Sequence, residues 1–453
     1  MTVLTSLFFM WGFMTVMNDV LVPHWKKDFA LSYWEGMSVS MCFFGAYFIG
    51  SFAYWLLSLW GYDPIVRFGY KRGAVLGLVI SAVGCALFVP ASYLHTFSGF
   101  LGALFVLGLG FTLLQISANP FVAIIGSEDG ASSRLNLAQA FNSLGTTLAP
   151  IIGGYLVFDR ISDSRSLELP YMVYCGIFLA LAGLLWITRL PEPAPPSTKG
   201  GRALRHPQVR YGMAAIFSYV GAEVAIGILF INFVKLPAVM GMEEGLGKFY
   251  LSLYWGGAMC GRFLGALALA DSAPQKWRTW LIAALGIALF GLLLAIQRLS
   301  GGLGPQAIWP MLVLIAINAA AFVVVGRSSS ATLGVFACIA AMLCGSAMMS
   351  HGSWALWSLV AIGLFNSVMW SNIFTLAIEG LKEDTSQGSS LLVMMIAGGA
   401  VIPKIQGLLA DSSWGLQLSF ALPLACYAYL AWYGFISSSH SSAYSANAPE
   451  RSA

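Results

Sequence analysis

The chain has 453 residues, of which 58% are hydrophobic and only 9% are Asp, Glu, Lys or Arg. An ordinary soluble domain carries roughly 25% charged residues, so this chain cannot cover a water-facing surface. The composition excludes soluble enzymes, nucleic-acid-binding proteins and disordered scaffolds. The formal net charge of +4 is too small to indicate an anionic partner. We therefore expect an all-α integral membrane protein whose surroundings are the lipid bilayer.

Six apolar runs in the first half of the chain are each long enough to cross a bilayer, which takes about 20 residues. They lie near residues 3–23, 36–60, 73–91, 99–124, 135–158 and 170–188. The first run begins MTVLTSLFFMWGF and has neither a basic n-region nor a small-residue cleavage site, so it is interpreted as a membrane helix and not as a signal peptide. Residues 1–190 are thus predicted to form a six-helix bundle.

Residues 191–210 differ sharply in composition, being rich in Pro, Gly and basic residues, as is typical of an aqueous linker between two bundles. Eight apolar runs follow, near residues 211–234, 249–270, 279–297, 307–326, 331–350, 353–378, 388–410 and 415–437. We expect a C-terminal bundle over 211–437, an inserted helix pair over 279–326 and a tail over 438–453. The total is about 14 membrane helices.

The basic residues predict the orientation of the chain. With the N-terminus placed in the cytoplasm, the inside loops and tail hold 14 Lys and Arg residues and the outside loops hold 7. An excess of basic residues marks the cytoplasmic side. Both termini are therefore predicted to be cytoplasmic, in a multi-pass protein of the inner membrane.

Searches for catalytic and metal-binding motifs return nothing. The seven cysteines lie in apolar runs without CxxC spacing, and no phosphate-binding loop, HExxH, GxSxG or histidine cluster occurs. We expect no enzymatic activity, no cofactor and no resident metal, and ATP does not drive the protein directly.

Two carboxylates lie within predicted membrane helices, where a charge costs roughly 2.5–3.5 kcal/mol on insertion scales. Asp19 lies beside Asn18 and about 7 residues before Lys26, and Glu223 lies about 13 residues beyond Arg210. Either is a candidate for cation coupling. The alternative for Asp19 is a helix-end carboxylate paired with a lysine, and for Glu223 a neutral buried acid.

Intramembrane amides indicate a polar ligand or interhelical contacts, because an amide in hydrocarbon must be satisfied. Gln139 and Asn142 are three residues apart and share a helix face. Amides beside an aromatic ring, with few fixed charges, are the groups that hold a neutral monosaccharide. The candidate substrate-binding residues are Asn18, Gln115, Asn119, Gln139, Asn142, Asn366, Trp370 and Asn372.

Seven strings resemble those of the sugar:cation symporters of the major facilitator superfamily, which include the fucose, glucose/galactose and N-acetylglucosamine permeases. The strings are LFFMWGFMTVMNDVLVPH, LLQISANPFVAIIG with SSRLNLAQAFNSLGTTLAPIIGG, YVGAEVAIG, YWGGAMCGRF, GLFNSVMWSNIFTLAIEG and QGSSLLVMMIAGGAVIPKIQGLLAD. The resemblance implies two six-helix bundles, here with two extra helices, and alternating-access transport.

The resemblance also implies roles for particular residues. The family's acid for proton coupling falls on Asp19 and its sugar-binding amides fall on Gln139 and Asn142. The fourth-helix acid of the fucose permease falls on Gln115, which cannot titrate. Coupling then rests on Asp19 alone, on Asp19 with Glu223, or on Na⁺ bound at Asp19, and the glutamine favours a glucose, galactose or N-acetylglucosamine substrate over fucose.

A basic turn after the second predicted helix resembles the cytoplasmic latch of superfamily members, with Arg67, Lys71 and Arg72 as the latch residues.

The leading hypothesis is cation-coupled uptake of a neutral monosaccharide by a protein that is a monomer. A sugar sensor without transport and a drug or lipid exporter are the alternatives from other classes.

Overall fold

The structure is a computed structural model that describes residues 1–28, 33–153, 168–190, 202–270 and 275–446. Within these ranges every regular element is a helix. Eleven helical spans of the described residues are long and apolar enough to cross a membrane. Three further long helices are α1 (Thr2–Asp28), α7 (Ala131–Gly153) and α10 (Glu244–Ala268). The all-α membrane fold predicted from the composition is confirmed.

The chain forms two compact units. Unit 1 contains Met1–Val209 and Ile378–Ala400, and unit 2 contains Arg210–Ala377 and Val401–Ala453. The chain passes from one unit to the other at Val209, inside the predicted linker 191–210, of which residues 191–201 lie outside the described part. Residues 378–400 belong to unit 1, although the sequence assigns them to the C-terminal bundle, because helix α16 (Thr385–Met394) packs on helices of unit 1.

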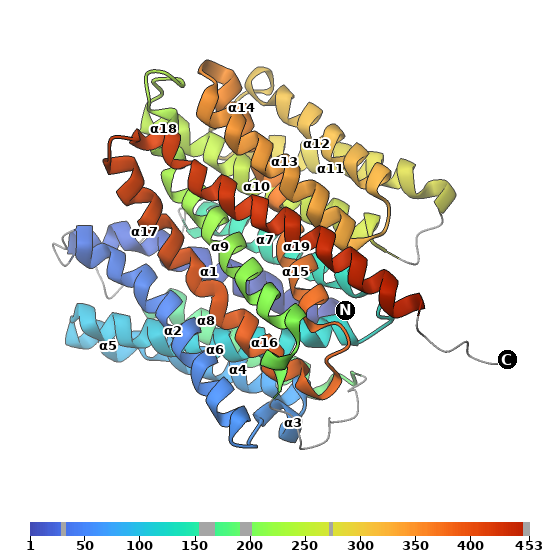
Figure 1. The fold of residues 1–453 in the computed structure, drawn as a ribbon. Coiled ribbons are helices and arrows are strands. Elements are labelled where there is room, and N and C mark those ends of the chain that lie inside the picture. Colours follow the sequence, from blue (N-terminus) through green and yellow to red (C-terminus); the bar gives the residue numbers. More distant parts are fainter. Residues whose placement is uncertain (29–32, 154–167, 191–201, 271–274, 447–453) are drawn as a thin grey trace. The chain divides into compact units, whose positions relative to one another are not determined.

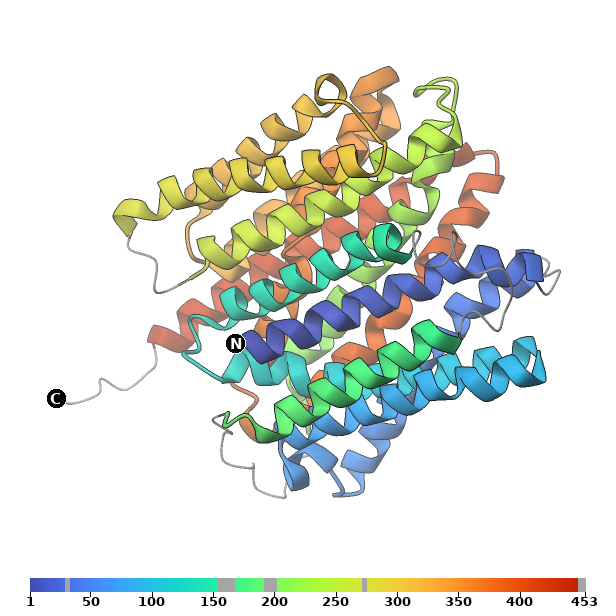
Figure 2. The same ribbon diagram turned by 180° about the vertical axis from the view of Figure 1, so that it is seen from behind.

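Unit 1 is built on close helix pairs, which can be followed in Figures 1 and 2. Helix α4 packs along α6 and α8, α2 packs on α6, and α16 packs on both α2 and α6. A Cβ at Gly77 of α4 would lie 2.8 Å from the Leu114 amide nitrogen, so the close approach requires glycine there. The remaining helices of unit 1 are α2 (Tyr33–Leu59), α3 (Pro64–Phe68), α4 (Tyr70–Ala86), α5 (Phe88–Leu94), α6 (Phe97–Ile124), α8 (Glu168–Ile187) and the short η3 (Ala203–Arg205), η4 (Lys382–Asp384) and η5 (Met395–Ala397).

Glycine also sets the contact between α1 and α7. A Cβ at Gly12 would overlap the Asn142 carbonyl, and a Cβ at Gly145 would overlap the Phe9 carbonyl. Small residues at such positions let two backbones approach closely in a membrane. The polar residues of α7 are thereby brought against α1.

Unit 2 is also built on packed helix pairs. Helix α13 packs between α14 and α19, and α10 packs on α14. Helices α11 (Gln275–Leu299) and α12 (Pro305–Val325) pack on each other and on α10, and Figures 1 and 2 show them side by side at one edge of unit 2. They occupy the stretch where the sequence places the inserted pair. The other helices are α9 (Pro207–Val234), α13 (Ser329–Met349), α14 (Gly352–Asn366), α15 (Met369–Ile378), α17 (Gly398–Asp411), α18 (Gly415–Ser419) and α19 (Ala421–Ala446).

Two membrane helices depart from regular hydrogen bonding. The span Gly352–Ile378 is interrupted at Ser367 and Val368, which separate α14 from α15. In α6, Pro120 lacks the amide hydrogen that would bond the carbonyl of Ile116. That carbonyl instead accepts a hydrogen bond of 3.1 Å from the Ser389 hydroxyl of α16. The proline thus creates an acceptor that joins α6 to α16.

Candidate functional site

A cavity of about 210 Å³ lies within unit 1. Pockets for drug-sized ligands usually measure roughly 300–1,000 Å³, so this one suits a smaller molecule. None of the residues lining it in the described part of the chain is charged. The lining consists of aromatic and aliphatic side chains with two amides and several hydroxyls, from Trp11, Thr15, Val39, Phe43, Phe44, Tyr47, Leu104, Gln115, Asn142, Thr146 and Ile396.

Two predicted binding residues, Gln115 of α6 and Asn142 of α7, meet in this cavity. The Asn142 amide nitrogen donates to the Phe8 carbonyl of α1 at 3.0 Å, which leaves its amide oxygen available to a ligand. Trp11, whose indole nitrogen donates to the Tyr47 hydroxyl at 3.3 Å, supplies an aromatic face beside them. The sequence analysis missed Trp11 and Tyr47, although Trp11 lies two turns before Asp19 on the same helix.

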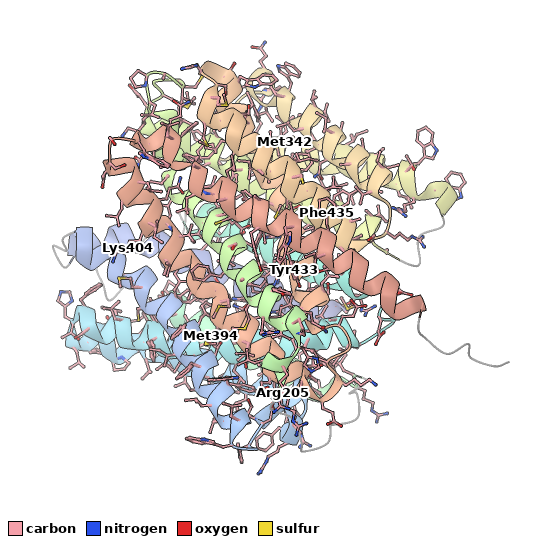
Figure 3. The ribbon with its side chains drawn as sticks, viewed as in Figure 1. Arg205, Met342, Met394, Lys404, Tyr433 and Phe435 are labelled. Atoms are coloured by element: carbon pink, nitrogen blue, oxygen red, sulfur yellow. The ribbon has the colours of Figure 1, made fainter. Side chains whose placement is uncertain are left out.

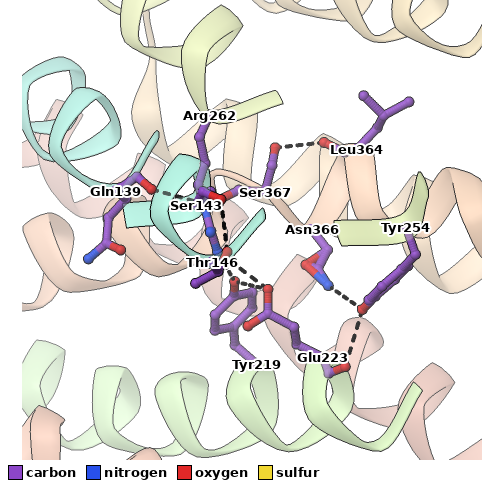
Figure 4. Close-up of polar contacts among 10 residues, drawn as sticks. All are labelled: Gln139, Ser143, Thr146, Tyr219, Glu223, Tyr254, Arg262, Leu364, Asn366 and Ser367. Atoms are coloured by element: carbon purple, nitrogen blue, oxygen red, sulfur yellow. Dashed lines mark hydrogen bonds and ion pairs between the residues drawn. The ribbon is translucent and has the colours of Figure 1, made fainter. Parts of the chain in front are cut away.

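Three other amides, on α6 and α7, are not among the described residues that line the cavity. Gln139, Asn119 and Asn136 are all buried. The Gln139 carbonyl accepts a hydrogen bond from Ser143 at 3.0 Å, drawn in Figure 4. Neither amide atom of Asn119 has a hydrogen-bond partner among the described residues. A fully buried amide without a partner is rare in native proteins and indicates a bound water or ligand.

Asn18 and Asp19 lie on α1. Their side chains fall outside the part of the chain that the structure describes. Their contacts are therefore left as predictions.

Glu223 of α9 belongs to a buried polar network in unit 2, shown in Figure 4. Its carboxylate accepts a hydrogen bond of 2.8 Å from the Tyr219 hydroxyl and pairs with the Arg262 guanidinium of α10 at 3.4 Å. The Arg262 Nε atom donates to the Ser367 carbonyl at 3.0 Å, so the arginine bonds a helix-end carbonyl. Glu223 is 9% exposed, and Arg262 places a counter-charge beside its carboxyl group within the same unit.

Asn366 and Trp370 flank the interruption between α14 and α15. The Asn366 amide nitrogen donates to the Tyr254 hydroxyl at 2.9 Å, and that hydroxyl donates to the backbone carbonyl of Glu223 at 3.2 Å. The Asn366 amide oxygen and the Trp370 indole nitrogen are buried without partners among the described residues. Asn372, the third predicted residue of this group, donates to the Ser329 carbonyl at 3.2 Å.

The predicted latch residues Arg67, Lys71 and Arg72 lie around α3. Arg67 is exposed and stacks over the Tyr62 ring at 4.0 Å, and Arg72 is exposed. The hydrogen bond from this region to α16 is made by an acid that the sequence analysis missed. Asp63 accepts a hydrogen bond of 2.6 Å from the Ser386 hydroxyl, and its other oxygen caps α3 by accepting from the amides of Ile65 and Val66. An Asp followed by Pro is a recognisable helix start that could have identified this residue.

A second set of contacts ties α16 to the rest of unit 1. The Gln387 amide donates to the Ser58 hydroxyl of α2 at 3.0 Å and accepts from the Ala203 amide at 2.8 Å. Asp384 pairs with His206 at 3.4 Å. The segment 202–206, from the predicted linker, is thus fixed against residues 384–387.

Lys404 of α17, labelled in Figure 3, is exposed.

An all-helical membrane protein whose described cavity lining is uncharged has an interior suited to a small neutral solute. Comparison with known proteins agrees. The family model of the Major Facilitator Superfamily matches residues 3–332. A glucose/galactose transporter of Brucella abortus is 39% identical over 97% of this chain and 94% of its own, and a putative glucose/galactose transporter of Helicobacter pylori is 36% identical over 95% and 94%.

Solved structures show the same fold. The Escherichia coli fucose:proton symporter FucP in its outward conformation superimposes with a TM-score of 0.74 at 26% identity, covering 96% of this chain and 98% of FucP. The chain belongs to the Major Facilitator Superfamily and, within it, to the family of the glucose/galactose transporters and the L-fucose-proton symporters. It is a transporter and not an enzyme.

Proposed function

We propose that the protein imports a neutral monosaccharide of the glucose/galactose or N-acetylglucosamine type, coupled to the entry of a cation. The observation that carries the proposal is the cavity of unit 1, whose lining among the described residues is uncharged and includes Gln115, Asn142, Trp11 and Tyr47. Amides bond vicinal hydroxyls and an indole covers the apolar face of a pyranose ring. The names of the Brucella and Helicobacter relatives support the same substrate class.

Further candidate sugar contacts are Gln139, Asn119 and Asn18 on the helices of unit 1, and Asn366, Trp370 and Asn372 on α14 and α15. The unpartnered atoms of Asn119, Asn366 and Trp370 support this role, because a sugar hydroxyl would satisfy them. Asn372 is already bonded to α13, which favours a supporting role for it.

For the coupling cation we propose H⁺ carried by Asp19. Position 115 is a glutamine, so it supplies no second carboxylate to the cavity. The Glu223 carboxylate is paired with Arg262 and is therefore not free. The L-fucose-proton symporter of Escherichia coli, 28% identical over 94% of this chain, supports proton coupling. Na⁺ bound at Asp19 is the alternative that the transport experiment distinguishes.

We propose 14 membrane helices, with α11 and α12 as the pair added to a twelve-helix plan. The basic residues favour cytoplasmic termini, and the bacterial relatives favour the inner membrane. Monomeric function is the simplest arrangement for this fold. Arg67, Lys71 and Arg72 are proposed to assist the contacts of Asp63 with α16 at the cytoplasmic side.

The test is uptake of labelled glucose, galactose, fucose and N-acetylglucosamine into proteoliposomes, under an inward pH gradient and an inward Na⁺ gradient imposed separately. We expect accumulation of glucose, galactose or N-acetylglucosamine with the pH gradient alone. Accumulation with Na⁺ alone would replace the proton by Na⁺. Failure to accumulate any of the four sugars under both gradients would overturn the proposed substrate class.

A further inference from the structure

The interruption between α14 and α15 exposes backbone carbonyls in the interior of unit 2. The last carbonyls of a helix have no partner within the helix, and in a membrane each must be satisfied by another group. The Leu364 carbonyl accepts hydrogen bonds from the Ser367 hydroxyl at 2.6 Å and from the amide of Asn318 at 3.2 Å. The Ser367 carbonyl accepts from Arg262. Side chains from two other helices, α10 and α12, therefore hold the interruption.

Asn318 comes from α12, a helix of the added pair. It is fully buried, whereas its neighbour Ile317 is 50% exposed. An asparagine is costly in a lipid-embedded helix and an aliphatic residue would suffice for packing alone. The burial of Asn318 and its hydrogen bond to the Leu364 carbonyl thus indicate that α12 stabilises the interruption between α14 and α15, in addition to packing at the edge of unit 2.

The helices meet along a glycine stripe on α10. A Cβ at Gly261 would overlap the Ser367 hydroxyl and the Leu364 carbonyl, and a Cβ at Gly265 would overlap the Val368 side chain and lie 3.2 Å from the Phe322 ring of α12. The stripe lets α10, α12 and the end of α14 share one seam. A shift of α12 would therefore displace Ser367 and Val368.

Residues on both sides of this interruption carry buried polar atoms without partners among the described residues. These atoms are the Asn366 amide oxygen, the Trp370 indole nitrogen and the Ser371 hydroxyl. Their directions depend on how α14 and α15 are joined. A side chain that holds the junction between α14 and α15 in place therefore also holds these polar atoms in the orientation needed to bind a ligand.

We infer that Asn318 is a positioning residue for substrate binding: through the Leu364 carbonyl, the added helix pair holds the α14–α15 junction so that Asn366, Trp370 and Ser371 bind the sugar. This inference rests on the proposed function. It gives the added pair a role in substrate affinity.

The experiment compares Asn318→Leu with the wild type in full-length protein, by initial rates of uptake into proteoliposomes across sugar concentrations. Asn318→Leu keeps the branched shape and the number of side-chain heavy atoms and removes the donor. We expect the KM to rise about threefold to twentyfold, the range spanned by measured interhelical hydrogen bonds in membranes, with Vmax within about twofold. Asn318→Ser, which keeps a hydroxyl donor, should give an intermediate KM. Ile317→Ala, on the exposed face of the same helix, is the matched control and should leave KM unchanged.

A wild-type KM for Asn318→Leu, or a loss of Vmax at unchanged KM, would overturn the inference. If Asn318→Leu does not elute as a monodisperse protein, Phe322→Leu decides, because it loosens the same seam without a polar change. A raised KM for that variant supports the inference and a wild-type KM overturns it. Failure of the proposed function is distinguished by the wild type, which would then take up none of the four sugars.

Discussion

The Ser386 hydroxyl donates a hydrogen bond of 2.6 Å to Asp63, a residue 323 positions earlier in the chain. The same carboxylate accepts a bond of 2.6 Å from the Tyr54 hydroxyl and caps α3. One acid thus joins α2, α3 and α16 within unit 1. Helix α16 continues through η5 into α17, whose residues from Val401 belong to unit 2.

Removing this acid should destabilise unit 1 more than removing its serine partner. Asp63→Ala loses the helix cap, worth about 0.5–2 kcal/mol, and the bonds to Tyr54 and Ser386 as well. Ser386→Ala loses a single hydrogen bond, worth about 0.5–1.5 kcal/mol. Thermal unfolding in detergent should therefore give a Tm order of wild type, Ser386→Ala, Asp63→Ala. Trp60→Ala, at a position that is 78% exposed and close to Asp63 in the sequence, serves as the control, and equal Tm values for all four proteins would contradict the role of Asp63.

Gln115 should contribute directly to sugar affinity. Gln115→Leu keeps the side-chain volume but strands the sugar hydroxyls that the amide would bond, so we expect the KM for sugar to rise about tenfold or more. The matched control is Gln297→Leu, since Gln297 is a buried amide that bonds the Phe249 carbonyl at 3.2 Å and does not line the cavity. That control should lower the Tm while leaving KM near the wild-type value. An unchanged KM for Gln115→Leu would move the sugar site elsewhere.

Asp19→Asn should separate coupling from binding. Without a titratable or cation-binding carboxylate, the variant should exchange sugar across the membrane but should not accumulate it against a gradient. Counterflow and gradient-driven uptake in the same proteoliposomes measure the two activities. Cation and sugar raise each other's affinity in a symporter, because coupling is reciprocal. Normal accumulation by Asp19→Asn would assign the residue a structural role.

Glu223→Gln should act chiefly on stability. Removing one partner of a buried ion pair leaves an uncompensated charge on Arg262 and typically costs about 3–5 kcal/mol. The double variant Glu223→Gln with Arg262→Met removes both charges and should recover part of the lost Tm. A double-mutant cycle of unfolding measures the coupling. If Glu223→Gln keeps the wild-type Tm and abolishes accumulation instead, Glu223 belongs to the coupling mechanism.

The acid Glu379 predicts a pH dependence of stability. Partial burial of its carboxyl raises the pKa of Glu379 above the ordinary 4.5, and repulsion from Glu128 and Asp129 raises it further. A raised carboxyl pKa means that the folded state binds the proton more tightly, so stability falls as pH rises through the window above 4.5. Glu379→Gln should therefore have a higher Tm than the wild type at neutral pH, and the two values should converge as pH falls toward 4.5. A constant Tm difference across that range would exclude this cause.

The sequence predicts the helices of this protein well. The runs near 279–297 and 307–326 correspond to α11 and α12, and Pro, Gly and basic residues mark the passage between the bundles at the place where the units separate. The reason is that transfer into lipid is decided segment by segment, by the hydrophobicity of about 20 consecutive residues. The free-energy cost of placing a polar side chain in lipid likewise identifies Glu223 and Gln115 as residues that must have a partner or a functional role.

The partners of those residues were decided only by the tertiary structure. Nothing in the sequence identifies Arg262 as the partner of Glu223 or Ser386 as the partner of Asp63. Nor does it indicate that Asn318 of α12 bonds the end of α14. These contacts depend on which helix faces meet, and that depends on small residues such as Gly12, Gly145 and Gly261 that let particular backbones approach. Hydropathy is a property of one segment, whereas a hydrogen bond between helices requires two distant segments to pack in one register.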